Sequence, residues 1–431
     1  MNKRIMRAVA ILPLALLVIA TGCFGAKPVD KPEASTTLTL YSTDPGGPEV
    51  QEVLDRAKTA FEQAHRGVTI HYAFTTLDRY FTDLDKLVQS GESPDLIIMG
   101  QAEFAPFEEK GYLQNLQPLA KANGDTLSNY YDEAILNLGV VKNRLVALMI
   151  NVSPVVVAYN TKVFAQANLP VPKDGWTWDD FANTARRLRD TIGAGRNNFQ
   201  AAVFPPGERL LAPLVLGRGG SYTSPDGTTV KGYLDGKDSV AALQWYRNQA
   251  ANNVIVTDYM PDVMERMIAG NVGMSVVGYE STRFVGAANK ADIAIVGLPR
   301  FADGKRVTVA YSNAVGVMKQ AKHPQLAWQF MKMLALEKND ITADMLRLTL
   351  NASKPVMAEK ADDPYIKVQL SEYKYVQRDV MDMNMDWVKV LALFQNGLAR
   401  SVLGRDDLLT SLSWLATQTD QQLLAYRNAR Q

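Results

Sequence analysis

The chain has 431 residues, of which 47% are hydrophobic and 21% charged. This length allows two or three separate cores. The formal net charge is +1 and no long basic run occurs, so a nucleic-acid-binding protein is not indicated. The three histidines are far apart and there is a single cysteine, so the sequence shows no cluster of nitrogen and sulfur ligands for a metal ion.

Residues 1–23 have the pattern of an export signal. Three basic residues precede a short apolar stretch over residues 8–20, and small residues then lead to Cys23. The apolar stretch is too short to cross a bilayer core of roughly 30 Å as a stable helix. Its end resembles a bacterial lipobox, in which the cysteine is lipidated and becomes the first mature residue. We therefore expect residues 1–22 to be a lipoprotein signal peptide, with plain secretion as the alternative.

Residues 23–37 contain glycine, proline and serine without an apolar period, which predicts a flexible tether. Without the three basic residues of the leader, 43 Lys and Arg remain against 45 Asp and Glu, a formal charge of −2. An exported protein with no second cysteine forms no intramolecular disulfide. Its stability must therefore come from buried apolar surface.

The segment from residue 38 to residue 99 predicts alternating strands and helices. Strands are expected over residues 38–41, 68–74 and 96–99, and amphipathic helices over residues 49–64 and 77–89. Crossovers of this length allow parallel pairing, with helices on both faces of the sheet. Ligands of such sheets bind beyond the carboxyl ends of the strands, which are here residues 42–47, 75–78 and 100–103.

Residues 140–160 (VVKNRLVALMINVSPVVVAYN) mark the expected passage from a first lobe to a second. The β-branched and aliphatic runs of this segment are typical of a strand buried on both faces. A hairpin inside one large domain is the alternative interpretation. Strands and helices then alternate again, with Thr177 and Asp180 placed as the capping box of a helix over residues 176–190. Further helices are expected over residues 236–252, 260–269, 323–336, 387–400 and 406–426, and strands over residues 272–277, 292–296 and 307–317.

No catalytic or phosphate-binding motif is recognisable. The sequence contains no G-x-S-x-G, and no histidine has a neighbouring partner that suggests a catalytic triad. The glycine patterns of phosphate-binding loops are absent as well. Because the chain has 45 acidic residues, a pair of carboxylates for glycoside hydrolysis is always available, although nothing singles one out.

Five motifs carry a family resemblance that covers most of residues 36–425. In chain order they are GESPDLIIM with GYLQNL (residues 91–99 and 111–116), VVVAYNTKVF with WTWDDF (155–164 and 176–181), MIAGNVGMSVVGYE (267–280), NASKPV (351–356) and the segment 403–415. Each motif is weak by itself, but five in this order are specific. Together they resemble the extracellular solute-binding proteins of bacterial sugar ABC importers, the family built like maltose-binding protein.

The resemblance implies a two-lobed α/β fold of the periplasmic-binding-protein type (class II), in which each lobe has a mixed, mostly parallel sheet flanked by helices. Residues 38–150 and 292–318 are expected in lobe 1, and residues 151–291 and 319–431 in lobe 2. Ligand would bridge the lobes and favour the closed form.

The function implied by the resemblance is that of a non-enzymatic, lipid-anchored extracytoplasmic receptor without a cofactor. It would capture a sugar or oligosaccharide and deliver it to separate permease subunits of an ABC transporter. A surface-anchored glycoside hydrolase or lyase, a receptor for a non-sugar solute, and a sugar-sensing accessory subunit are the alternatives.

Binding of a polyhydroxylated ligand requires aromatic faces for its C–H patches and planar polar groups for its hydroxyls. From lobe 1 the candidates are Asp44, Tyr80, Gln101 and Glu103. A turn or capping role is the alternative for Asp44, Gln101 and Glu103. Tyr80 lies on the apolar stripe of its helix, which favours the core.

From lobe 2 the candidates are Trp176, Tyr279, Glu280 and Trp387. Tyr279 and Glu280 directly follow a predicted strand, where the family places aromatic residues that stack on ligand. Ordinary packing is the alternative for Trp387. Two further candidates, Tyr311 and Asn313, interrupt an apolar strand where the family's chain passes the cleft, and either a backbone group or a ligand would satisfy the polar atoms there.

Overall fold

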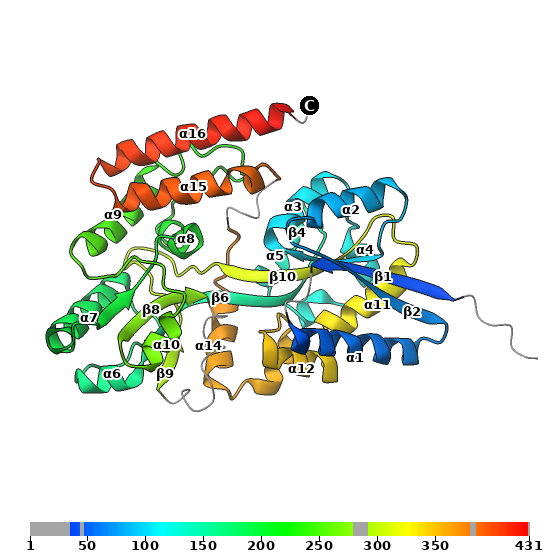
Figure 1. The fold of residues 1–431 in the computed structure, drawn as a ribbon, viewed down its shortest axis with the longest axis horizontal. Helices are drawn as coiled ribbons and strands as arrows, with labels where there is room; N and C mark the ends of the chain where they lie inside the picture. The colour runs from blue at the N-terminus through cyan, green and yellow to red at the C-terminus, as the bar shows by residue number, and fades with distance from the viewer. Residues whose placement is uncertain (1–34, 44–46, 279–291, 380–384, 430–431) are drawn as a thin grey trace, which may run out of the picture.

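The structure is a computed structural model that describes residues 35–43, 47–278, 292–379 and 385–429. Figure 1 shows two groups of helices packed on strands, joined in the middle by the long strands β6 (Leu148–Asn160) and β10 (Ala310–Val317). The expected signal peptide, Cys23 and most of the tether lie outside the described residues.

The first lobe begins with the predicted alternation of strands and helices. Strand β1 (Thr36–Thr43) pairs in parallel with β2 (Val68–Thr75) on one side and with β3 (Leu96–Gly100) on the other. Helices α1 (Pro48–Ala64) and α2 (Tyr80–Gln89) make the two crossovers. The parallel arrangement that the sequence predicts is therefore confirmed.

Strand β6 runs through both lobes. Its first half pairs antiparallel with β10, and its second half pairs antiparallel with β8 (Val272–Gly278) and β9 (Ile293–Val296). Strand β7 (Gln200–Val203) lies parallel to β8 at the far edge. The strand order β2-β1-β3-β10-β6-β8-β7 makes one sheet that continues from lobe to lobe. Rotation of one lobe against the other must therefore involve β6, β10 and the third crossing segment, residues 374–379, where Val376 bridges to Thr308.

The segment 140–160 contains both structures that the sequence suggested. Strands β4 (Val140–Val141) and β5 (Arg144–Leu145) form a hairpin. Its turn residues Lys142 and Asn143 have φ angles of 48° and 61°, the left-handed conformation that tight hairpin turns require. The crossing strand β6 begins directly after this hairpin, so each interpretation describes one part of the segment.

The remaining helices cover the two sheets. On the first lobe these are α3 (Gln101–Glu109), α4 (Leu116–Ala122), α5 (Glu133–Leu138), α11 (Pro324–Ala335), α12 (Asp340–Leu348) and α13 (Lys354–Met357). On the second lobe they are α6 (Thr161–Gln166), α7 (Trp178–Thr191), α8 (Glu208–Gly217), α9 (Lys237–Ala251), α10 (Val263–Ile268), α15 (Met385–Leu403) and α16 (Leu408–Ala429). Helix α14 (Pro364–Tyr373) contributes side chains to cores on both sides.

The hydrophobic cores favour a different division into lobes from the one expected from sequence. Side chains of α11, α12 and α13 belong to the core built on β1, β2 and β3, whereas the sequence-based division assigns residues 319–431 to lobe 2. Strand β9 pairs with the second half of β6, although residues 292–318 were expected in lobe 1. The physical reason is burial, because Trp328 and Met331 of α11 are fully enclosed against the first sheet.

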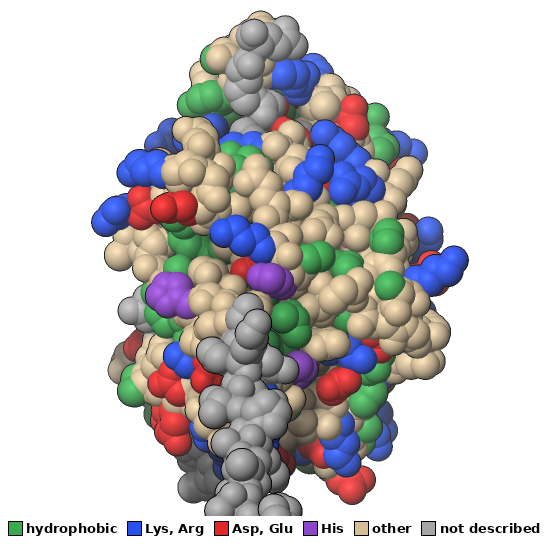
Figure 2. Space-filling model, turned by 90° about the vertical axis from the view of Figure 1, so that its right-hand side faces the viewer, with side chains coloured by type: hydrophobic (Ala, Val, Ile, Leu, Met, Phe, Trp, Pro, Cys, Tyr) green, Lys and Arg blue, Asp and Glu red, His purple; other side chains and the backbone are tan. Residues whose placement is uncertain are grey.

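The described surface carries charge of both signs. On the face shown in Figure 2, basic and acidic side chains both occur without a continuous basic stripe. Among the residues that the structure describes, none of the helices combines the length and apolar character that a membrane-spanning segment needs.

Candidate functional site

Two cavities meet at the side chain of Tyr311, where β10 passes between the lobes. The first, which we call the polar cavity, has a volume of about 350 Å³. It is lined by Gly100, Gln101, Ala102, Glu103, Asn151, Arg209, Tyr311, Ser312 and Asn313. These residues come from the carboxyl end of β3, the start of α3, the crossing strands β6 and β10, and α8 of the second lobe. The site lies where ligands of open α/β sheets are expected.

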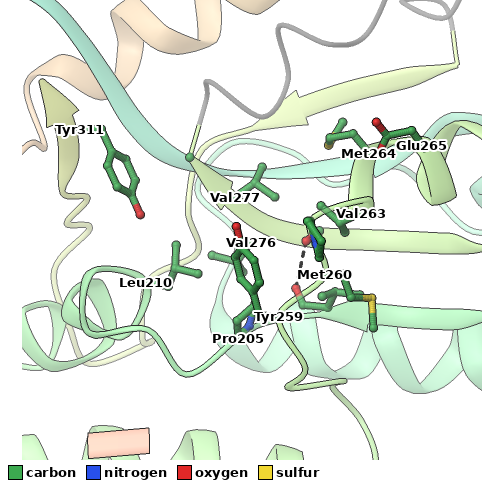
Figure 3. Close-up of a pocket in the computed structure, with 14 residues that line it drawn as sticks. Pro205, Leu210, Tyr259, Met260, Val263, Met264, Glu265, Val276, Val277 and Tyr311 are labelled. Carbon is green, nitrogen blue, oxygen red and sulfur yellow. Dashed lines mark hydrogen bonds between the residues drawn. The ribbon is translucent and has the colours of Figure 1, made fainter. Parts of the chain in front are cut away.

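The second, which we call the apolar cavity, has a volume of about 420 Å³ and lies at the carboxyl ends of β7 and β8. Figure 3 shows Tyr311 and Leu210 at one side of it and Met260, Val263 and Met264 at the other. Helix α10 and the loop before it supply the methionines. Tyr311 lines both cavities.

Arg209 connects the two lobes at this site. It lies on α8 of lobe 2, yet its guanidinium donates hydrogen bonds to Oε1 of Gln101 in lobe 1 and to the carbonyl of Ala310, the latter at 2.7 Å. Its Nε is 3.2 Å from Oδ2 of Asp379, and its carbon Cζ lies 4.5 Å from the ring centre of Tyr311. Because Arg209 is only 5% exposed, its charge needs these partners.

Glu103 lines the polar cavity and has one deeply buried carboxylate oxygen. Its Oε2 is buried and has no hydrogen-bond partner among the described residues. Burial raises the pKa of this carboxyl to about 7, against the opposing effect of backbone hydrogen bonds at Glu103 and Gly100. Near neutral pH the group can therefore accept a hydrogen bond or, when protonated, donate one. A side chain at Gly100 would lie 2.8 Å from this oxygen, so glycine keeps the space open.

The edge of β10 adds further polar groups. The backbone N–H of Asn313 donates to Oδ1 of Asn151 at 2.8 Å, at a point where the register between β10 and β6 shifts. The hydroxyl of Ser312 is buried without a partner in the described part of the chain. Buried polar atoms that lack partners next to a cavity are groups that a ligand can satisfy.

The structure brings together four of the residues predicted from sequence. Gln101, Glu103, Tyr311 and Asn313 all line the polar cavity. The predicted candidates Asp44, Tyr279 and Glu280 lie outside the described residues.

Three predicted candidates lie in the cores and line neither cavity. Tyr80 is 2% exposed and its hydroxyl donates to the carbonyl of Ile98. The indole N–H groups of Trp176 and Trp387 donate to the carbonyls of Gly297 and Gly227, each at 2.9 Å. Since the polar atoms of all three side chains are satisfied by backbone, their rings pack as core residues.

Arg209, Asn151 and Ser312 were not predicted as site residues. Arg209 follows Glu208 at the start of an otherwise apolar helix, and a charge in such a helix needs a partner when buried. The charged residue in an apolar helix is a local signal of a site, but the partners of Arg209 come from distant segments of the chain. Among the described residues no group of three or more side chains is placed to hold a metal ion.

Comparison with known proteins gives similar folds. The sugar-binding protein MalE of Xanthomonas citri superposes with a TM-score of 0.78 at 14% identity, covering 91% of this chain and 98% of that one. The ABC substrate-binding protein Lmo0181 of Listeria monocytogenes, solved in complex with cycloalternan, gives a TM-score of 0.71 at 18% identity, covering 90% and 99%. These likenesses confirm the expected two-lobed periplasmic-binding-protein fold.

A curated relative from Streptomyces antibioticus, "Uncharacterized lipoprotein in oleD 5'region", is 24% identical over 218 residues, which are 50% of this chain and 45% of that protein. The match thus spans about half the length of each. The family model described as "Bacterial extracellular solute-binding protein" matches residues 42–341, which is most of the chain. Proteins of this family bind solutes and are not enzymes. The chain therefore belongs to the bacterial extracellular solute-binding proteins.

Proposed function

We propose that this protein captures a sugar or oligosaccharide between its lobes by hinge closure and delivers it to the permease subunits of an ABC transporter. The observation that carries this proposal is the polar cavity, whose lining comes from lobe 1, lobe 2 and both crossing strands. A solute held there contacts both lobes and so favours the closed arrangement.

The chemistry of the cavity suits a neutral, hydroxyl-rich solute. Gln101, Asn313 and Glu103 offer amide and carboxyl groups, which can pair with adjacent hydroxyls. The ring of Tyr311 is 41% exposed and provides a face for C–H groups. Proteins with this fold have been solved with cycloalternan, tagatose and maltotetraose, which supports a carbohydrate as the cargo.

Isothermal titration of the mature protein with a panel of mono- and oligosaccharides tests the proposal. We expect at least one sugar to bind. Gln101→Ala should weaken that binding by about tenfold, because the lost hydrogen bond between the Gln101 amide and the sugar, next to the charged Arg209, is worth roughly 1.5 kcal/mol. Gln421→Ala, on the exposed surface of α16, serves as the matched control and should bind normally. A panel without any binding, or equal losses in both variants, would contradict the proposal.

We also propose that the mature protein is anchored to the membrane by a lipid on Cys23. The lipobox-like pattern before this residue supports the anchor, and one relative is named a lipoprotein. Expression of the full chain should place the protein in the membrane fraction, with a diacylglyceryl mass on the N-terminal peptide. Cys23→Ser should move it to the soluble extracytoplasmic fraction. An unmodified N-terminal peptide starting elsewhere would show plain secretion instead.

A further inference from the structure

The apolar cavity differs in chemistry from the polar cavity next to it. Its walls are aliphatic and thioether side chains, mainly those of Leu210, Met260, Val263, Met264 and Val277. The polar side chains in its described lining are those of Ser275, Glu265, Tyr259 and Tyr311. The hydroxyl of Ser275 already donates to the carbonyl of Val203 at 3.3 Å. Glu265 lies on the exposed rim.

Such walls do not suit a sugar ring. A hydroxyl buried against the aliphatic and thioether walls loses its hydrogen bonds to water and gains none from them, which is unfavourable. The tyrosine hydroxyls of the lining belong to Tyr259 at the mouth and to Tyr311 on the side shared with the polar cavity. An alkyl or aryl group has no such loss, and methionine side chains adapt to its shape because they are unbranched and polarisable. The volume of about 420 Å³ is within the usual range for small-molecule pockets, roughly 300–1,000 Å³.

The two cavities are adjacent enough to hold one solute. Tyr311 lines both, and its ring closes against Gly278 at the end of β8, where a Cβ atom would lie 2.9 Å from the ring. At the mouth of the apolar cavity the side chain of Tyr259 is 82% exposed. A large aromatic side chain with that exposure gains burial when an apolar group fills the cavity beside it.

We infer that the cargo of this protein is an amphipathic glycoside. Its sugar end occupies the polar cavity, and an alkyl or aryl aglycone occupies the apolar cavity beyond Tyr311. The inference rests on the proposed function, because it assigns the second half of the same cleft.

Isothermal titration of the mature protein with methyl, butyl and hexyl β-D-glucosides and β-D-maltosides, kept below their micellar concentrations, tests the inference. Each methylene that is buried should strengthen binding about fourfold. A hexyl chain has roughly five methylenes more than a methyl group, and burial of only about two of them makes hexyl glycosides bind at least about tenfold more tightly than methyl glycosides. Equal affinity along the series, or binding of unsubstituted oligosaccharides only, would overturn the inference and leave sugar binding intact. Absence of binding by every glycoside and oligosaccharide would overturn both proposals.

Variants place the alkyl group in the cavity. Met260→Gln and Val263→Thr keep side-chain size at two positions that are not fully buried. We expect each to reduce the gain from methyl to hexyl by about fivefold or more while methyl glycosides bind as before. Gln101→Ala should instead weaken all members of the series equally. Leu424→Gln, at an exposed apolar position on α16, controls for nonspecific binding of alkyl chains. If the gain in affinity from methyl to hexyl glycosides is unchanged in both cavity variants, the alkyl group does not occupy the apolar cavity and the inference is overturned.

Discussion

The carboxyl of Glu103 links pH to the stability of the folded protein. Its pKa is raised by burial to about 7, from an ordinary value of 4.5. Because its pKa is raised by folding, the carboxyl holds its proton more tightly in the folded protein than in the unfolded chain. Its contribution to the free energy of unfolding is therefore fully present below pH 4.5 and is lost as pH rises through 7. Glu103→Gln removes this loss. We expect the variant to be more stable than the natural protein at pH 8 by roughly 3 kcal/mol, since the two pKa values differ by about 2.5 and each pKa unit corresponds to about 1.4 kcal/mol.

Urea unfolding of the ligand-free protein at pH 5 and pH 8 measures this effect. The two proteins should be closer in stability at pH 5 than at pH 8. Glu49→Gln, at an exposed position in the first turn of α1, should leave both midpoints unchanged. If Glu103→Gln keeps the natural pH dependence, the carboxyl is not the titrating group. Glu372, whose pKa burial likewise raises to about 7, would then be the next residue to vary.

Single site residues are predictable from the sequence where a polar group interrupts or directly follows an apolar strand. Gln101 and Glu103 directly follow the buried strand β3, and Asn313 interrupts β10, so local pattern was enough to find them. For Trp176 and Trp387 the sequence offers an aromatic side chain that could stack on a ligand, and for Trp387 also a position that opens a predicted helix after a polar stretch. Whether an indole N–H finds a backbone carbonyl depends on distant chain segments, as the bonds to Gly297 and Gly227 show, and no local signal reports that.

Among the elements of lobe 1, Asp95 holds three segments together at the start of β3. Its Oδ2 accepts the backbone N–H of Thr39 in β1 at 3.0 Å. Its Oδ1 accepts the backbone N–H groups of Lys322 and His323, just before α11, at 2.9 and 3.3 Å. Asp95 is 5% exposed, and its removal leaves three partly buried backbone N–H groups without this partner.

We expect Asp95→Ala to destabilise the protein by about 3 kcal/mol, because hydrogen bonds to charged groups contribute roughly 1.5–3 kcal/mol and three backbone donors lose this acceptor. Asp95→Asn keeps an acceptor oxygen and should cost less. Asp303→Ala is the control, because its ion pair with Arg218 is on the surface and such pairs contribute about 0–1 kcal/mol. Denaturant midpoints compare the three variants. A cost for Asp95→Ala no larger than that of Asp303→Ala would show that the connection is not needed.

The elements themselves were predictable where their signals are local. The capping box at the start of α7 is formed as predicted, with the N–H of Asp180 donating to the hydroxyl of Thr177 at 3.1 Å. The lobe to which an element belongs was less predictable. Helices α11 to α13 follow β10, and their place depends on which sheet buries their apolar faces, a long-range outcome of the antiparallel pairing of β10 with β3 and β6.

On the scale of the whole molecule, the hydrogen bond from Arg209 to Gln101 joins the two lobes, which are also connected by the crossing segments and by contact between α3 and α15. Opening of the cleft must separate α8 from the start of α3 and therefore break this bond. Arg209 keeps its contacts with Ala310 and Asp379, since these lie on the segments about which the lobes turn. The bond to Gln101 is thus one whose energy differs between open and closed forms.

Gln101→Ala should accordingly shift the ligand-free protein toward the open form. A loss of about 1.4 kcal/mol from the closed form changes the ratio of the two forms about tenfold. Small-angle X-ray scattering should then give a larger radius of gyration for the ligand-free variant than for the natural protein. The urea midpoint should change little, because Gln101 lies at the cleft. The donor that loses its acceptor is the guanidinium of Arg209, which keeps Ala310 and Asp379 as partners. Gln421→Ala should scatter like the natural protein. Identical scattering from the Gln101 variant and the natural protein would mean that the bond does not control closure. The balance between open and closed forms would then be set by the crossing segments or by the contact between α3 and α15.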